Sequence, residues 1–130
     1  MGQANILEGG AGNDVIDGGN GANDIVEYWD ATAAVNVSLL SGRTTVDGQG
    51  GADTLSGIEN VGGSNFNDTI LGDANNNSIW SGNGADSIDG GAGNDNIGFK
   101  ATTTKTSTVK LGAGDDKLLL KAAGVAAGAT

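Results

Sequence analysis

The sequence has no cysteine and no histidine, and only 4% of its 130 residues are aromatic. Without these two residue types the chain cannot form disulfides, zinc fingers, or nucleophiles of the Cys–His and Ser–His kinds. No hydrophobic run approaches transmembrane length, and the first residues lack the basic start and apolar stretch of a Sec-type signal. The composition predicts a single domain with a thin core and no redox chemistry.

Positive charge is also scarce, with six Lys and Arg against sixteen Asp and Glu and a formal net charge of −10. Arg43 is the single basic residue of positions 1–99, whereas the five lysines lie in positions 100–130. Phosphate binding requires clustered Lys and Arg, so we expect no nucleic acid partner and no insertion into an anionic membrane. The acidic part of the chain instead requires cations.

Glycine is abundant, with 25 residues, and it recurs in a unit of nine residues. The cleanest copies begin at Gly9 and Gly90 and read GGAGNDVID and GGAGNDNIG. Each copy combines a glycine turn, an acidic residue and a short strand centred on an aliphatic residue. The unit recurs without a break between Gly63 and Gly98. This period is typical of a calcium-binding β-solenoid.

The glycines permit a tight reversal of the chain, because glycine adopts positive φ without a steric clash, and Asn at the fifth place tolerates the same conformation. Such a turn directs several carbonyl oxygens into one space, and the acidic residue adds a carboxylate. Calcium takes six to eight oxygens at about 2.3–2.6 Å. Asp and Asn could instead form only metal-free Asx turns, but that alternative does not require a nine-residue period.

Two nonapeptides complete one coil, so turns two repeats apart stack on the same edge and can share an ion. This arrangement pairs Asp68 with Asp86 and Asn77 with Asp95. Without an ion, two carboxylates about 4 Å apart repel by up to about 4 kcal/mol at an effective dielectric constant of about 20. Calcium converts this repulsion into a cross-link.

The aliphatic residue at the eighth place of each repeat is expected to point inward, forming two facing ladders. These ladders alone are too small to order the chain, so ions must contribute substantially to folding. The ladder residues are Leu7, Ile16, Val26, Leu55, Ile70, Ile79, Ile88, Ile97 and Leu118.

We expect a single domain over residues 1–130. Regular repeats occupy 5–26 and 48–98, enlarged coils about 27–47 and 99–111, a last repeat 111–119, and an apolar tail 120–130. Alternation of apolar and polar residues from Ala33 to Leu39 predicts a longer half-buried strand in the first enlarged coil. The threonines of 102–108 favour a solvated loop over an ice-binding array. The tail could be a secretion signal, a cap or a sticky end.

These motifs resemble the RTX (repeats-in-toxin) family of hemolysin-type calcium-binding repeats, whose unit is GGxGxDxUx with U aliphatic. The resemblance implies an all-β, right-handed parallel β-roll that binds several Ca²⁺ ions and leaves a Gram-negative cell by type I secretion. It implies aspartate ligands at Asp14, Asp24, Asp53, Asp68, Asp86, Asp95 and Asp116, with Asn77 in place of an acid. It also implies turn carbonyls from residues such as Gly10, Gly12, Gly19, Gly21, Gly84, Gly91, Gly93 and Gly114. Where Asn77 replaces the acid and Ser64-Asn65-Phe66 replaces the glycines, we expect weak or empty sites.

Two hypotheses for function remain open. The first is a non-enzymatic, secreted structural protein that folds on meeting extracellular calcium and self-assembles as a filament, S-layer component or matrix protein. The second is the folding and secretion module of a larger exoenzyme, adhesin or toxin. Catalysis is disfavoured, because the acidic pairs recur in equivalent copies rather than once in a cleft. Tyr28, Trp29 and Trp80 could form a glycan platform, although packing is favoured.

Overall fold

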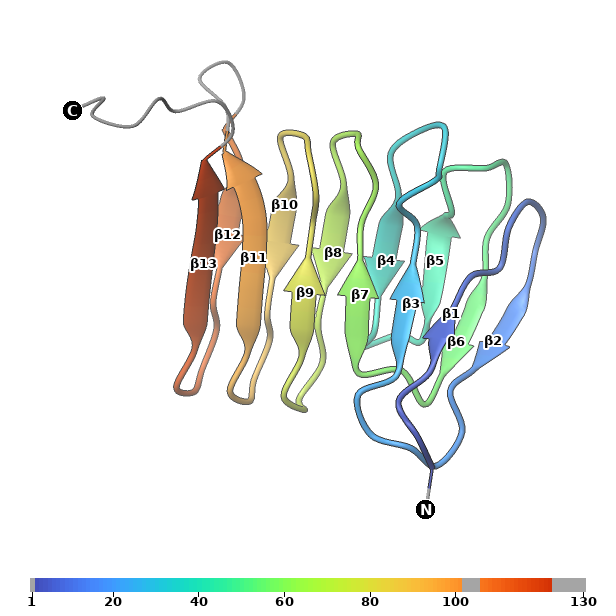
Figure 1. Ribbon diagram of the computed structural model, residues 1–130, viewed down its shortest axis with the longest axis horizontal. Coiled ribbons are helices and arrows are strands. Elements are labelled where there is room, and N and C mark those ends of the chain that lie inside the picture. The colour runs from blue at the N-terminus through green and yellow to red at the C-terminus, as the bar shows by residue number, and fades with distance from the viewer. Residues whose placement is uncertain (1, 102–105, 123–130) are drawn as a thin grey trace.

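The computed structural model describes residues 2–101 and 106–122 and consists of strands joined by turns (Figure 1). No helix long and apolar enough to cross a membrane occurs in that part of the chain. The strands are β1 (Ile6–Leu7), β2 (Val15–Asp17), β3 (Ile25–Glu27), β4 (Asn36–Ser38), β5 (Arg43–Val46), β6 (Thr54–Ser56), β7 (Asn60–Gly62), β8 (Thr69–Leu71), β9 (Ser78–Trp80), β10 (Ser87–Asp89), β11 (Asn96–Ala101), β12 (Thr108–Lys110) and β13 (Lys117–Ala122).

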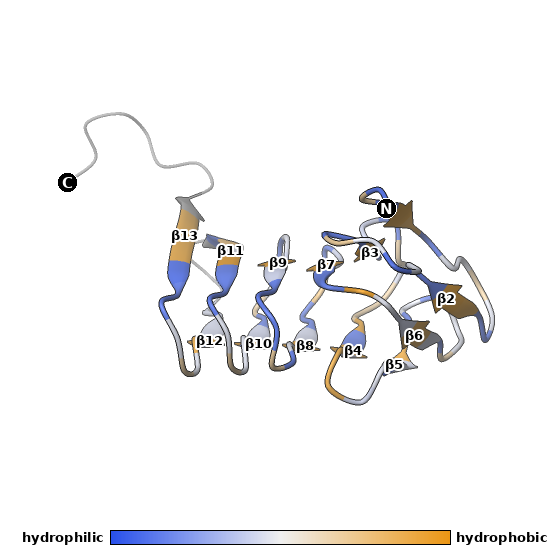
Figure 2. Cartoon of the chain, turned by 90° about the horizontal axis from the view of Figure 1, so that it is seen from below, coloured by the Kyte–Doolittle hydropathy of each residue, from blue (hydrophilic) through white to orange (hydrophobic). Residues whose placement is uncertain are grey.

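The strands form two sheets that face one another (Figure 2). The six-stranded sheet has the order β1-β3-β7-β9-β11-β13 and is parallel throughout. The seven-stranded sheet has the order β12-β10-β8-β4-β5-β6-β2. From β6 onward the chain passes from one sheet to the other at every turn. The all-β class is confirmed, and the arrangement is consistent with a β-roll, whereas the hand of the coil remains a prediction.

The pairing register follows the nine-residue unit. Ile70 lies opposite Ile88 in one sheet and Ile79 lies opposite Ile97 in the other, so neighbouring strands of a sheet are two nonapeptides apart. The next coil is enlarged by three residues, because Ile88 pairs with Val109. The predicted spacing of the regular repeats is therefore confirmed.

The core is the double aliphatic ladder that the repeats predict. Val26, Ile70, Ile79, Ile88 and Ile97 are all at most 1% exposed. A strand of three residues presents its central side chain inward and its flanking ones outward, which selects the eighth place of the repeat.

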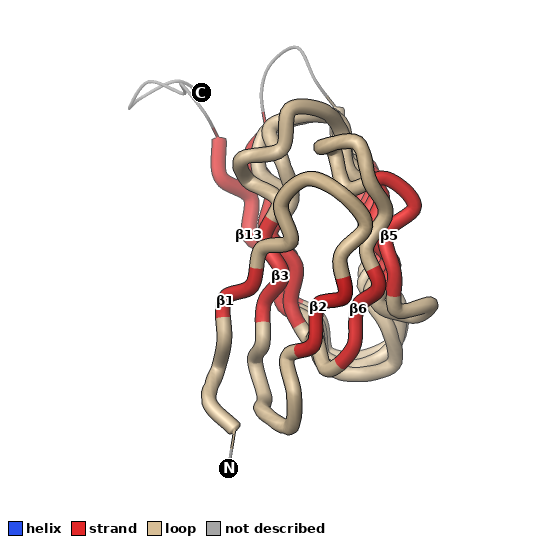
Figure 3. Tube along the Cα trace, turned by 90° about the vertical axis from the view of Figure 1, so that its right-hand side faces the viewer, coloured by secondary structure: helices blue, strands red, loops and turns tan. Residues whose placement is uncertain are grey.

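Leu118 continues the ladder in register, opposite Ile97, but it is not buried like the other members. Leu118 is 49% exposed, because β13 is the outermost described strand of its sheet and packs on β11 from one side only. Leu7, in the outermost strand β1, is likewise only partly buried. Figure 3 views the molecule from the end at which β1 and β2 lie. Chain after residue 122 lies outside the described residues, and so do Thr102, Thr103 and Thr104 of the threonine cluster.

The first enlarged coil departs from the expected parallel arrangement. Its predicted long strand is only Asn36–Ser38, although Val35, Val37 and Leu39 are buried in alternation as expected. The chain then reverses at Gly42, whose φ is +67°, and returns as β5. β5 pairs antiparallel with both β4 and β6, so this sheet is mixed. The extra residues of this coil are accommodated because β4, β5 and β6 are three consecutive strands of the same sheet.

We expect Ile79→Ala to lower the free energy of unfolding of the calcium-bound protein by about 2–5 kcal/mol, because it leaves a cavity in the ladder. Val15→Ala is the matched control, since Val15 is 81% exposed and should change stability by less than about 0.5 kcal/mol. Urea denaturation in saturating calcium measures both. Equal midpoints for the two variants would contradict the ladder core.

Candidate calcium sites

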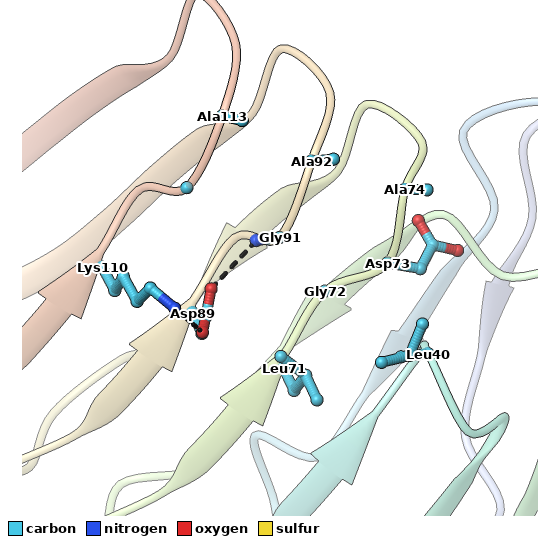
Figure 4. A pocket seen from close by; sticks show the side chains of 11 residues that line it. Leu40, Leu71, Gly72, Asp73, Ala74, Asp89, Gly91, Ala92, Lys110 and Ala113 are labelled. Atoms are coloured by element: carbon cyan, nitrogen blue, oxygen red, sulfur yellow. Dashed lines mark hydrogen bonds and ion pairs between the residues drawn. The ribbon is translucent and has the colours of Figure 1, made fainter.

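The turns between the strands lie in two stacks on opposite edges of the molecule (Figure 1). The first turn stack comprises residues 9–14, 47–53, 63–68 and 81–86. The second comprises residues 18–24, 57–59, 72–77, 90–95 and 111–116. Figure 4 shows part of the second stack, where the turns that contain Ala74, Ala92 and Ala113 lie side by side.

The glycine turns have the conformation that the sequence predicts at most positions. Gly91 and Gly93, for example, have φ values of +91° and +103°. Gly21 is an exception, because the insertion in its repeat moves the positive φ to Asn23 at +69°. The other predicted turn glycines with positive φ are Gly10, Gly12, Gly19, Gly84 and Gly114.

The expected reason for Asn at the fifth place is incorrect in the regular turns. None of these asparagines has positive φ; instead, their side-chain carbonyls accept a hydrogen bond from the backbone N–H of the next turn in the stack. These bonds are 2.8–2.9 Å long and hold consecutive turns in register. The accepting residues are Asn13, Asn67, Asn76 and Asn94.

A second ladder of hydrogen bonds runs through the aspartates. Its members lie two residues before each core aliphatic residue. The backbone N–H of each member donates a hydrogen bond to the side-chain oxygen of the corresponding residue in the next coil, with N···O distances of 2.7–3.1 Å. Each carboxylate of the ladder therefore has one oxygen fixed by the preceding coil. The donors and acceptors are Asn5 and Asp24, Asp14 and Asp53, Asp24 and Glu59, Val35 and Asp68, Asp68 and Asp86, Asn77 and Asp95, Asp86 and Ser107, and Asp95 and Asp116.

The second carboxylate oxygen faces a space beside a glycine. A β-carbon built on Gly90 would lie 2.5 Å from Oδ2 of Asp95 and 2.6 Å from the carbonyl oxygen of Leu111. On the other edge, Gly63 has the same relation to Oδ2 of Asp68 at 2.7 Å and the carbonyl of Ser81 at 2.6 Å. A side chain would fill these spaces, so glycine leaves room for something that carboxylate and carbonyl oxygens can hold in common.

Three of the predicted ligand carboxylates have an unsatisfied oxygen. Oδ2 of Asp14, Asp24 and Asp95 is buried and accepts no hydrogen bond. A buried carboxylate oxygen without a partner is costly, so it requires a cation or a proton. The donor set is all oxygen, which is the set that calcium prefers.

Carbonyl oxygens complete these spaces. The carbonyl of Gly91 lies 1.7 Å from the position that a β-carbon of Gly112 would take, and the carbonyl of Gly93 lies 1.8 Å from that of Gly114. A side chain at Gly112 or Gly114 would therefore clash with the preceding turn. The residues present fit calcium ions held between consecutive turns.

Burial of charge sets the electrostatics of the sites. Asp24, Asp53, Asp68, Asp86 and Asp95 are at most 2% exposed, and no Lys or Arg is buried in the part of the chain that the structure describes. Burial raises the pKa of Asp53, Asp68 and Asp95 above the usual carboxyl value. The charges of neighbouring aspartates raise the pKa of Asp53 and Asp95 further. No basic side chain whose burial is described accompanies these carboxylates into the interior.

The RTX calcium-binding nonapeptide repeat matches the chain in four copies, over residues 2–26, 40–57 and 62–97. The chain belongs to the RTX repeat family. RTX nonapeptide repeats bind Ca²⁺ ions, so calcium is the cofactor that the stacked turns accept. No curated protein matches the chain.

Two of the RTX positions differ from the rest, as the sequence departures predict. Both carboxylate oxygens of Asp68 are hydrogen-bonded by Ser64, through its N–H at 2.7 Å and its hydroxyl at 2.5 Å. Asn77 accepts from the N–H of Asp73 at 2.8 Å and donates to the carbonyl of Glu59. An ion at either position would have to displace or share these hydrogen bonds.

Several site residues were missed from the sequence. Glu59 accepts the backbone N–H of Asp24 at 3.0 Å, and its place two residues before Val61 could have identified it as an acidic ladder member. Tyr28 donates its hydroxyl to Oδ2 of Asp53 at 3.2 Å, and burial followed by the charge of Asp53 raises its pKa. No repeat rule signals this contact, because Tyr28 comes from the enlarged coil.

The structure also bears on the alternatives. Tyr28 is 3% exposed and packs in the core, so it cannot belong to a glycan platform. Trp29 and Trp80 are 60% and 37% exposed and line one pocket. A groove of about 590 Å³ follows the second turn stack (Figure 4), and its charged residues include Asp89 and Lys110, which form an ion pair of 3.2 Å.

No group of three or more Asp, Glu, His or Cys suited to a metal occurs within residues 2–101 and 106–122. A calcium ion between two turns would therefore take backbone carbonyls as well as carboxylates as ligands.

We expect Asp95→Asn to weaken folding at a fixed calcium concentration by about 1.5–3 kcal/mol, because a charged ligand and hydrogen-bond acceptor becomes neutral. The calcium midpoint of folding, followed by circular dichroism, should rise accordingly. Asp17→Asn is the control, because Asp17 is exposed and accepts only the N–H of Gly19 within its own turn. The same midpoint for both variants would exclude Asp95 as a ligand.

Acidity should act in opposite directions with and without calcium. A carboxyl pKa raised by folding destabilises the ion-free fold above the unfolded pKa, and this penalty is relieved as the pH falls through the folded pKa. When a chelator removes calcium, the β-structure content should therefore increase as the pH falls from about 7 toward about 4, near the pKa of an ordinary carboxyl group. In calcium, the midpoint should rise over the same range because protons compete for the ligands. Circular dichroism at several pH values measures the β-structure in chelator and the calcium midpoint. A loss of β-structure on acidification in the presence of chelator would contradict the burial of ionised aspartates in the fold.

Proposed function

We propose that the protein is a secreted, non-enzymatic structural protein whose folding is triggered by extracellular calcium. The observation that carries this proposal is the set of buried carboxylates without buried basic partners among the described residues. At low calcium these charges oppose folding, and calcium both neutralises them and links successive turns. RTX repeats are typical of type I-secreted proteins of Gram-negative bacteria, which supports an extracellular location.

The proposed ligands are the ladder aspartates and the turn carbonyls predicted from the repeat. Asp14, Asp24 and Asp95 are the strongest candidates, because each has a buried unsatisfied oxygen. Asp68 and Asn77 are weaker candidates, since their side chains already have protein partners. Asp116 is half-buried in the last described turn and receives the N–H of Asp95 at 2.9 Å.

Self-assembly at the cell surface or in the matrix is the second part of the proposal. β1 and β2 are the outermost strands at one end, where Ile6 and Val15 are 69% and 81% exposed. β12 and β13 are outermost at the other end, where Leu119 is 59% exposed. Among the described residues these edges pair with no further strand. Edges of this kind with apolar side chains favour pairing with another strand, and head-to-tail contacts that do not close produce filaments.

The alternative is a folding and secretion module of a larger exoenzyme, adhesin or toxin. The same open edge at β1 and β2 favours it, because preceding coils of a longer chain would cover this edge as well as a second copy would. The oligomeric state of the folded protein in calcium distinguishes the two functions.

The test is a calcium titration of chelated protein, followed by circular dichroism and light scattering, with magnesium as the control ion. Structural assembly predicts a calcium-specific gain of β-structure with rising scatter and visible fibres. The same gain with a monomeric mass would favour the module. No gain in structure would overturn calcium-triggered folding altogether.

A charge placed on the open end should block assembly without preventing folding. We expect Val15→Lys to abolish the rise in scatter in calcium, because a lysine at the outermost strand opposes pairing at the edge. Val46→Lys is the matched control, since Val46 is 47% exposed but β5 lies inside its sheet. Fibres from Val15→Lys that equal those from Val46→Lys would contradict end-to-end stacking.

A further inference from the structure

Asp47 is a buried acidic residue that the nonapeptide pattern does not assign to a calcium site. It follows β5 of the inserted hairpin and is 0% exposed. In the sequence it directly precedes a turn glycine, as Asp17 and Asp89 do in the regular repeats. Asp17 is exposed and Asp89 is half-buried, so this place in the repeat does not by itself require burial.

Only one oxygen of Asp47 takes part in shaping its turn. Oδ1 accepts the N–H of Gln49 at 2.7 Å and that of Gly51 at 2.8 Å. Asp17 uses one oxygen in the same way, toward the N–H of Gly19 at 2.9 Å. Oδ2 of Asp47 is buried and accepts no hydrogen bond. The turn therefore explains one oxygen of this carboxylate and leaves the other unaccounted for.

The unsatisfied oxygen faces the neighbouring turn of the first stack. A β-carbon built on Gly51 would lie 2.7 Å from Oδ2 of Asp47 and 1.8 Å from the carbonyl oxygen of Gly12. Two oxygens from chain segments far apart in sequence thus border one space, as a carboxylate and a carbonyl do beside Gly63 and Gly90.

The turn of residues 9–14 lacks the carbonyl partner that regular turns have. The three atoms nearest to a β-carbon on Gly9 belong to Asp14 and Ile16, and Oδ2 of Asp14 is the closest at 2.8 Å. The carbonyl of Gly48, which would match it in the next turn, instead accepts the N–H of Thr32 at 3.1 Å. Asp14 thus has an unsatisfied oxygen on the same pair of turns as Asp47.

We propose that Asp47 is a further ligand of the calcium ion held between turns 9–14 and 47–53, together with the Gly12 carbonyl and Asp14. In this site a carboxylate from the inserted hairpin takes the part that a turn carbonyl plays in regular repeats. The ion fastens the β4–β5 hairpin to the first repeat. This inference rests on the proposed calcium-dependent folding and adds to it a ligand outside the repeat pattern.

The test is a count of bound calcium per chain in Asp47→Asn. The amide oxygen can still accept the hydrogen bonds of Gln49 and Gly51, whereas the amide nitrogen cannot bind a cation. Elemental analysis after dialysis against saturating calcium, with isothermal titration calorimetry, should give one ion fewer than the wild type. Asp17→Asn, which removes a comparable carboxylate from an exposed turn, should bind as many ions as the wild type.

An unchanged count in folded Asp47→Asn would overturn the inference. If this variant fails to fold in saturating calcium, anomalous diffraction from calcium-bound wild-type crystals decides the question. A calcium peak within about 2.6 Å of Oδ2 of Asp47 is expected; peaks at other turns with none here would overturn it. A wild type that binds no calcium would instead refute the proposed function, so the two failures are distinguishable.

Discussion

The constraint on which the structure depends is the burial of carboxylates between stacked turns. Each ladder aspartate accepts a backbone N–H from the preceding coil, so the coils cannot stack without bringing these charges out of water. Burial of an ionised carboxylate is unfavourable unless a positive charge accompanies it. Because the described part of the chain buries no Lys or Arg, we propose that folding and cation binding occur together.

The glycines serve this same constraint. Where two turns meet, the carbonyl of one occupies the place that a side chain of the other would need, as Gly91 and Gly112 illustrate. Close approach at such a place therefore requires glycine on the side that faces the carbonyl. The thin aliphatic ladder fixes the distance between the sheets, and we propose that ions held at the turns stabilise the folded chain.

The inserted hairpin shows how much irregularity this arrangement tolerates. β5 adds an antiparallel strand to one sheet, and the other sheet remains parallel throughout. The hydrogen-bond ladder continues across the insertion, because the N–H of Val35 reaches Asp68 and the N–H of Asp14 reaches Asp53. The hairpin also contributes Asp47, whose burial departs from that of Asp17 and Asp89 at the same place in the repeat.

The sequence by itself determined the repeat, the all-β class, the core ladder and the pairing of Asp68 with Asp86 and Asn77 with Asp95. These features follow from short-range periodicity, since one nonapeptide carries its own turn, ligand and core residue. The tertiary structure alone decided the antiparallel hairpin, the exposure of Leu118 and the contact of Tyr28 with Asp53. It also decided that Asp47 faces Gly12. Each of these depends on which coil lies next to which, and sequence spacing does not encode that adjacency once an insertion interrupts the period.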